Sequence, residues 1–212
     1  MKALIYDGPE AVTFREVPEP IPSQDNVLIK IKAVGICGSD MHAYLGHDER
    51  RPAPLILGHE AAGIISGGKR DGERVTINPL VSCGDCLVCK ARRENICPNR
   101  QIISMPPREG AFAQYVSMPE KNLVIVPNDY PLEKAALVEP LAVGWHTAKL
   151  AVRALDVTME KRALVIGGGA IGLATALALN AMGIDDLTIS EFNPLRRENL
   201  LQHIDAKVVE KA

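Results

Sequence analysis

A glycine-rich turn between an apolar strand and an apolar helix constrains the fold of this chain more than any other feature. The short apolar run Ala163–Ile166 is followed by Gly167, Gly169 and Gly172, and an Ala/Leu-rich segment then continues to Met182. Glycines at this spacing permit a tight turn, let backbone approach a bound group and let the helix pack closely on its strand. The segment therefore predicts a strand, a glycine turn and a helix over 167–182.

The same alternation of elements continues to the end of the chain. A second strand is expected over Leu187–Ser190, a helix capped by Asn193 follows, and a third strand is expected over Ala206–Val209. Strands alternating with helices are typical of a doubly wound parallel sheet, which is built from two such halves. Only the first half is expected here, so residues 151–212 are assigned to an incomplete α/β Rossmann domain.

The glycine turn also predicts a ligand. A helix that begins behind such a turn offers unpaired N–H groups to a pyrophosphate. Glu191 ends the second strand, nineteen residues after Gly172, where a carboxylate accepts hydrogen bonds from ribose hydroxyls and repels a 2′-phosphate. NAD is therefore favoured over NADP. Arg196 fits either a role beside a phosphate or a position over the ribose, and the alternative for the whole motif is an ordinary turn beside a surface acid.

The first 130 residues have a different, β-rich pattern. Short apolar runs alternate with Gly and Pro, and strands are expected over 1–6, 27–34, 63–65, 74–77, 115–117 and 123–126. This pattern suits a small barrel-like domain with long loops. Helices are expected over Leu132–Leu137 and Leu141–Val152, which places Glu139 at or near the beginning of the second helix.

Composition excludes several classes of function. The net charge of −2 argues against nucleic acid as the main partner, and no apolar run approaches the roughly 20 residues that span a bilayer. The amino-terminal residues have no apolar segment typical of a signal peptide. A cytoplasmic protein that binds neither nucleic acid nor membrane is the expectation.

Four of the five cysteines lie within fifteen residues, at Cys83, Cys86, Cys89 and Cys97. Four thiolates in one loop fit a closed tetrahedral zinc site with no position left for substrate, so a structural zinc is predicted. An iron–sulfur cluster and free thiols are the alternatives, although the seven-residue gap before Cys97 is longer than the ferredoxin pattern.

The fifth cysteine belongs to a second candidate metal site. Cys37 lies in a Gly-Ile-Cys-Gly-Ser-Asp-Met-His segment, and His59 and Glu60 follow 22 residues later. One thiolate, one imidazole and a carboxylate make an incomplete shell with room for water or substrate. Taken singly, Cys37 fits a buried thiol and His59 fits a hydrogen-bonded core histidine.

Together these motifs, in this order, resemble the zinc-containing medium-chain alcohol dehydrogenase family over the whole chain. Glu139 followed by Pro140 is closer to the polyol (sorbitol-like) and threonine dehydrogenase branch than to the ethanol branch. The resemblance implies a GroES-like catalytic domain over 1–150. It further implies a catalytic zinc held by Cys37, His59 and Glu60, with Glu139 bound directly or through water, and a structural zinc held by the four-cysteine loop.

The resemblance also implies a reaction, in which hydride passes from a secondary alcohol, polyol or sugar-derived hydroxyl to NAD. Asp40 would orient His59, and Ser39 and His42 would carry the proton from the hydroxyl to solvent. A surface role is the alternative for His42. In a full-length form a homodimer or homotetramer is expected. The competing functions are a truncated, inactive zinc-binding fragment and a zinc-free quinone reductase, which would leave the cysteines without a role.

Overall fold

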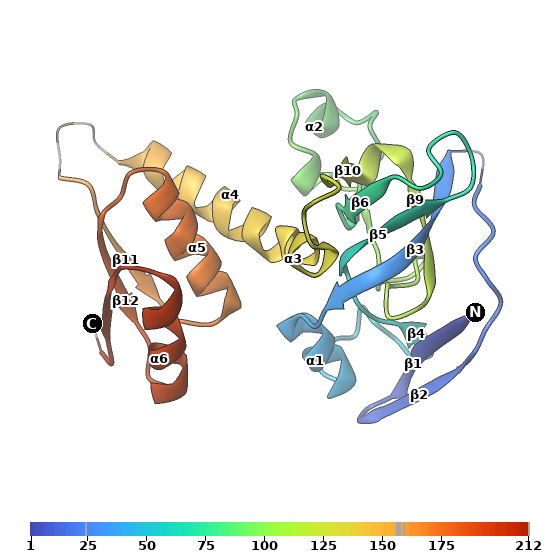
Figure 1. Cartoon of the computed structure of the whole chain (residues 1–212), viewed down its shortest axis with the longest axis horizontal. Helices are drawn as coiled ribbons and strands as arrows, with labels where there is room; N and C mark the ends of the chain where they lie inside the picture. Colours follow the sequence, from blue (N-terminus) through green and yellow to red (C-terminus); the bar gives the residue numbers. More distant parts are fainter. Residues whose placement is uncertain (24, 156–157, 159, 212) are drawn as a thin grey trace. The chain divides into compact units, whose positions relative to one another are not determined.

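The computed structural model describes residues 1–23, 25–155, 158 and 160–211. Its contacts divide the chain into two compact units, Met1–Glu139 and Pro140–Ala212 (Figure 1). The expected domain boundary at residue 150 lies inside helix α4 (Val138–Ala154).

Antiparallel sheets make up the first unit. A three-stranded sheet has the order β2-β1-β4, and a five-stranded sheet has the order β10-β6-β5-β3-β9. The strands of the first are β1 (Lys2–Gly8), β2 (Ala11–Glu16) and β4 (Leu55–Ile56). Those of the second are β3 (Asn26–Gly35), β5 (Glu60–Ser66), β6 (Arg74–Ile77), β9 (Tyr115–Pro119) and β10 (Leu123–Ile125). Short strands β7 (Leu80–Val81) and β8 (Gln101–Ile102) pair with each other.

Strand β5 shows how the first unit buries both faces of its larger sheet. Ala61 and Ile65 belong to the main core, while Ala62 and Ile64 belong to a second cluster with helix α3 (Leu132–Ala136). Successive strand residues point to opposite faces, so one strand contributes to both clusters. This explains why β5 is apolar nearly throughout instead of alternating with polar residues.

The pairing of β3 with β5 brings two sequence motifs together. Gly35, the last residue of β3, lies opposite Glu60, the first residue of β5. Helix α1 (Gly38–Tyr44) follows β3 directly. The residues around Cys37 and the loop that ends at His59 therefore lie at the same end of the sheet.

The second unit is a parallel α/β unit. Strands β11 (Arg162–Ile166), β12 (Asp186–Ser190) and β13 (Lys207–Val209) form one parallel sheet in that order. Helices α5 (Ala170–Ala181) and α6 (Pro194–His203) connect them (Figure 1). Their shared core includes Val165, Ile184, Ile189 and Leu200.

The termini of α5 and α6 follow from particular residues. Helix α5 begins at Ala170, later than the expected Gly167, because Gly167 has φ +97° and Gly169 is extended. A positive φ is compatible with glycine and incompatible with a continuing helix. Asn193 caps α6, since its Oδ1 accepts from the amides of Leu195 and Arg196 at 2.9 and 3.2 Å, as expected. Within the described residues, no helix is both long and apolar enough to cross a membrane.

Candidate metal centres and nucleotide turn

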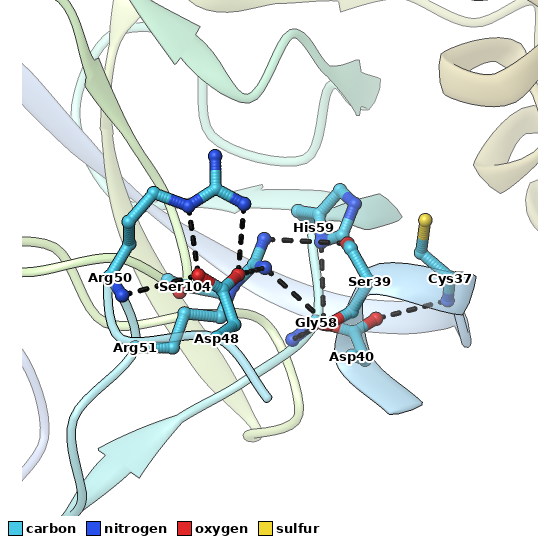
Figure 2. A network of polar contacts seen from close by, with 9 residues as sticks. All are labelled: Cys37, Ser39, Asp40, Asp48, Arg50, Arg51, Gly58, His59 and Ser104. Carbon is cyan, nitrogen blue, oxygen red and sulfur yellow. Dashed lines mark hydrogen bonds and ion pairs between the residues drawn. The ribbon is translucent and has the colours of Figure 1, made fainter. Parts of the chain in front are cut away.

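Asp40 fixes the start of helix α1 to the loop before His59. Its Oδ2 accepts from the backbone N–H of Cys37 at 3.0 Å, and its Oδ1 accepts from that of Gly58 at 3.2 Å. His59 Nδ1 also lies 3.4 Å from Asp40 Oδ1 (Figure 2). Asp40 is 3% exposed, so these contacts are shielded from water. The carboxylate therefore sets the positions of two candidate ligands at once, as expected for a residue that orients a metal-binding histidine.

Cys37, His59 and Glu60 converge on one centre. One ligand atom from each lies within 4.8 Å of the others. His59 and Glu60 are buried, while Cys37 is half-buried. Gly35 makes room for Glu60, because a Cβ at Gly35 would lie 2.2 Å from Glu60 Oε2. A thiolate, an imidazole and a carboxylate at this spacing fit a zinc ion that keeps one position open.

The electrostatics of these side chains are strongly coupled. Burial would lower the pKa of His59, but hydrogen bonds to Asp40 and Cys37 outweigh it and raise this pKa to about 10. The hydrogen bond with His59 lowers the pKa of Cys37. Burial raises the pKa of Asp40, yet contact with His59 and the backbone amides leaves it lowered overall. The coupling therefore favours a thiolate at Cys37, the form that binds metal, beside a protonated His59, which has to release its proton to bind metal.

Glu139 lies outside this three-residue cluster. It is in the first turn of α4, which confirms its expected place at the start of that helix. Burial raises the pKa of its carboxyl, the positive charge of His59 lowers it, and the negative charges of Glu60 and Asp40 raise it. Glu139 thus interacts electrostatically with the candidate centre from a half-buried position.

The four cysteines of the loop also converge. Sγ atoms lie 3.5 Å apart for Cys97 and Cys83, 3.9 Å for Cys83 and Cys89, and 4.0 Å for Cys86 and Cys97. Zinc–sulfur bonds of about 2.3 Å in a tetrahedron place the sulfurs roughly 3.8 Å apart. All four cysteines are free, so no disulfide accounts for this approach. The spacing fits a single four-thiolate ion and is too close for a cluster in which each cysteine binds a different iron.

Local structure brings these sulfurs together. Cys86 caps helix α2 (Leu87–Lys90), its Sγ accepting from the amide of Cys89 at 3.4 Å, and Cys97 ends the 3-10 helix η1 (Glu94–Ile96). Backbone amides of Cys86 and Asp85 lower the pKa of Cys83 to about 6, whereas burial raises that of Cys89 to about 12. At neutral pH Cys83 therefore ionises and Cys89 stays protonated, and a divalent cation bound between them would stabilise both thiolates.

Ser39 and His42 both lie on α1, but only Ser39 faces the buried network. Arg51 Nη2 lies 3.4 Å from Ser39 Oγ and donates to it (Figure 2). His42 is exposed, and its ring centroid lies 6.3 Å from that of His47. Among the described residues, no hydrogen bond joins Ser39 to His42.

The glycine turn of the second unit has the packing that its sequence predicts. A Cβ at Gly172 would lie 1.9 Å from the carbonyl oxygen of Gly167, so only glycine fits there. Glu191 is buried, and its two carboxylate oxygens accept from the amides of Gly168 and Asn193, each at 2.7 Å. These backbone hydrogen bonds lower the pKa of Glu191. Arg196 is largely exposed, and its Nη1 lies 3.8 Å from Glu191 Oε2.

Sequence reasoning missed one buried cation. Arg51 is 3% exposed and contacts Asp48, Ser39 and Ser104. In the sequence it stands within a charged run from Asp48 to Arg51, which resembles a solvated loop. The only sequence signal is that two prolines, Pro52 and Pro54, and an apolar segment follow that run directly.

Comparison with known proteins places these features in a family. The family described as the alcohol dehydrogenase GroES-like domain matches residues 23–128. This chain belongs to the zinc-containing medium-chain alcohol dehydrogenase family. The match contains Cys37, His59 and the four-cysteine loop, and it confirms the expected β-rich GroES-like fold of the first unit.

Characterised dehydrogenases of several substrates are similar to this chain. Sorbitol dehydrogenase of Bacillus subtilis (strain 168) is 37% identical over 207 residues, covering 93% of this chain and 58% of that protein. L-galactonate-5-dehydrogenase of Escherichia coli (strain K12) is 34% identical over 216 residues, covering 99% of this chain and 62% of that protein. L-threonine 3-dehydrogenase of Chelativorans sp. (strain BNC1) is 37% identical over 206 residues, covering 92% of this chain and 58% of that protein. These similarities confirm the polyol and threonine dehydrogenase branch expected from Glu139.

A solved structure agrees with both units of the fold. An alcohol dehydrogenase from Escherichia coli CFT073 complexed with NADH has a TM-score of 0.88 at 29% identity, covering 99% of this chain and 62% of that one. The β-rich unit followed by a parallel α/β unit is thus confirmed. The chain spans roughly three fifths of the length of the curated relatives that it matches.

Proposed function

We propose that this chain forms part of an oxidoreductase that transfers hydride from a secondary alcohol, polyol or sugar-derived hydroxyl to NAD. Its first unit would bind zinc, and its second unit would bind part of the dinucleotide. The convergence of Cys37, His59 and Glu60 within 4.8 Å carries the proposal. These three side chains would hold a zinc ion and leave one coordination position for substrate. Glu139, half-buried in the same unit, would bind this zinc ion directly or through water.

The two zinc ions would have different chemistry. The four cysteines would hold a closed, structural ion, because thiolates fill every position of a tetrahedron. In the other site, a bound zinc ion supplies a Lewis acid that makes a hydroxyl group more acidic. Asp40 orients His59 for that site through its contact with Nδ1.

The protein's own residues would handle the proton. Ser39 Oγ accepts the proton of the substrate hydroxyl and passes its own proton toward His42, which is exposed to solvent. The substrate carbon loses hydride, so the alcohol becomes a carbonyl compound and one proton reaches solvent. NAD supplies the hydride acceptor at its nicotinamide ring.

The glycine turn would bind the cofactor from the second unit. Gly167, Gly169 and Gly172 permit close approach of a pyrophosphate to the start of α5. Glu191 keeps a lone pair on each oxygen for ribose hydroxyls, and its negative charge disfavours a 2′-phosphate. Arg196 would lie beside this ribose. We also propose a cytoplasmic location and a homodimer or homotetramer in the full-length form, with residues 1–150 as the catalytic domain.

Metal analysis and a substrate panel test the proposal together. The full-length form prepared with zinc is expected to hold about two zinc ions per chain and to reduce NAD with at least one polyol or secondary alcohol. A chelator that removes one zinc ion is expected to abolish the activity while the fold persists. One zinc ion per chain, or a broad polyol panel with no chelator-sensitive NAD reduction, would contradict it.

A further inference from the structure

Arg51 is a buried cation that the mechanism above does not use. Its side chain is 2% exposed, and that of its partner Asp48 is 8% exposed. Arg51 Nη1 lies 2.6 Å from Asp48 Oδ2, and Nε donates to the carbonyl oxygen of Ser104 at 3.0 Å. Burying a guanidinium is costly unless every donor finds a partner. Two further N–H donors of this guanidinium, one on Nη1 and one on Nη2, are directed at Ser39.

Ser39 receives two contacts from Arg51. Nη1 donates to the Ser39 carbonyl oxygen and Nη2 to Ser39 Oγ, both at 3.4 Å (Figure 2). Ser39 is two residues after Cys37, in the first turn of α1. Arg51, in the loop after α1, thus contacts Ser39, which lies between the candidate ligand Cys37 and the exposed His42 in the sequence.

The direction of the Arg51 contact constrains the serine proton. A guanidinium only donates hydrogen bonds, so Ser39 Oγ must accept from it. The single hydroxyl proton is then excluded from the Arg51 side, and it lies toward Cys37, whose sulfur is hydrogen-bonded to the Ser39 side chain. One lone pair of Oγ stays free to accept a proton from a second group.

We propose that Arg51 is a positioning residue for proton transfer: its guanidinium holds the Ser39 hydroxyl with one lone pair toward the substrate site and its proton ready to leave. This inference rests on the proposed function, in which Ser39 carries the substrate proton. Arg51 acts through Ser39 and does not touch the reacting atoms.

Arg51 has a structural role as well, which the test has to separate. Ser104 is fully buried and has φ +63°, a conformation uncommon for a residue with a side chain. Its carbonyl oxygen accepts from Arg51 Nε. Replacing Arg51 therefore lowers stability through Ser104 even if Ser39 is irrelevant to catalysis.

Arg50 offers a matched control. It also pairs with Asp48, through Nε at 2.8 Å, but its side chain is 70% exposed and, within the part of the chain that the structure describes, it makes no hydrogen bond with Ser39. R50Q removes a charge of the same sign one residue away. R51Q removes the buried charge, and R51K keeps the charge but loses the planar fork.

A double-mutant cycle on kcat is the main experiment, with zinc-loaded protein, NAD and the best polyol of the panel. R51Q is expected to lower kcat about tenfold or more, R51K less, and R50Q not measurably. In the S39A background R51Q is expected to cause no further loss, because Arg51 acts through the hydroxyl. R51Q is also expected to raise the solvent deuterium isotope effect on kcat, which a general loss of stability does not do.

Equal losses from R51Q with and without S39A, or an unchanged isotope effect, would overturn the proposal. A second arm does not need activity: crystal structures of zinc-loaded wild type and R51Q compare the Ser39 side-chain rotamer. A rotamer that changes in R51Q supports the positioning role, and an unchanged one contradicts it. If the wild type oxidises no substrate, the proposed function fails, while the rotamer comparison still decides the role of Arg51.

Discussion

The two candidate metal centres both contain cysteine, but they use it in different ways. In the four-cysteine loop, three pairs of sulfurs lie 3.5 to 4.0 Å apart, and two short helices hold them. At the other centre a single sulfur meets the imidazole of His59, directly before β5, and the carboxylate of Glu60, the first residue of β5. The four thiolates would fill every position of a tetrahedral zinc ion, whereas the three ligands of the other centre would leave one position open.

The two centres also differ in how their ligands are connected to the rest of the fold. The loop makes its own site, because its ligands are fourteen residues apart at most and the backbone amides of Lys90, Arg93 and Cys97 donate to carbonyl oxygens of the same loop. The open centre takes its ligands from β3–α1 and from the start of β5, and Asp40 connects them. A closed site therefore stabilises its own loop, whereas an open site needs a folded scaffold to hold its ligands apart from one another.

The largest expected effect is the loss of the closed site. Cys97 is fully buried, and C97S replaces a thiolate by a hydroxyl that binds zinc poorly. The variant is expected to lose one zinc ion per chain and the structure of residues 83–97, because structural zinc binding contributes about 10 kcal/mol or more to small zinc sites. Zinc analysis and limited proteolysis measure both. Retention of two zinc ions would contradict the four-thiolate assignment.

The second prediction removes the equivalent residue from the open site. C37S is expected to lose the other zinc ion and more than about 99% of NAD reduction, because the site loses its thiolate ligand and the Lewis acid. Thermal unfolding is expected to stay close to wild type, since the sheet does not depend on this ion. An unfolding midpoint lowered as far as in C97S would show that the two sites are not different in kind.

The third prediction concerns Asp40, which holds the open site together. The Asp40 carboxylate accepts from the backbone N–H groups of Cys37 and Gly58 at 3.0 and 3.2 Å. In D40N the side-chain NH₂ replaces one of the two accepting oxygens, so one of these N–H groups faces another donor. Zinc affinity at this site is expected to fall about 10- to 100-fold. Competition with a chromogenic chelator measures it, and the four-cysteine ion serves as the internal standard. Equal weakening of both ions would mean that D40N acts on the fold as a whole.

The contrast between the centres also explains which parts were predictable from sequence. The four-cysteine site was predictable because its ligands are close in sequence and need only short turns. The Gly167–Gly172 turn was predictable for the same reason, since strand, glycines and helix follow one another. The exception there is the start of α5, where the positive φ of Gly167 delays the helix.

Long-range contacts could not be read from the sequence. Arg51 finds Ser104 fifty-three residues away, and a charged run gives no sign that its side chain is buried. The need for glycine at Gly35 depends on Glu60 across the sheet. Strand β2 was missed although Val12 and Phe14 alternate with Thr13 and Arg15, and in the structure all of its residues are exposed.

The smallest expected effect tests how far the closed site is independent of the sheets. Lys121 Nζ donates to the carbonyl oxygen of Ser82 at 2.8 Å, next to the first cysteine of the loop, and this contact is exposed to water. K121M is expected to lower the free energy of unfolding by only about 0.5 to 1 kcal/mol and to leave zinc content unchanged, because the ion and not this bond organises the loop. Urea unfolding measures the first and metal analysis the second, with K90M at an exposed position of α2 as the matched control. Loss of zinc in K121M alone would mean that the loop depends on its anchorage, and the distinction between a self-sufficient and a scaffolded metal centre would then have to be abandoned.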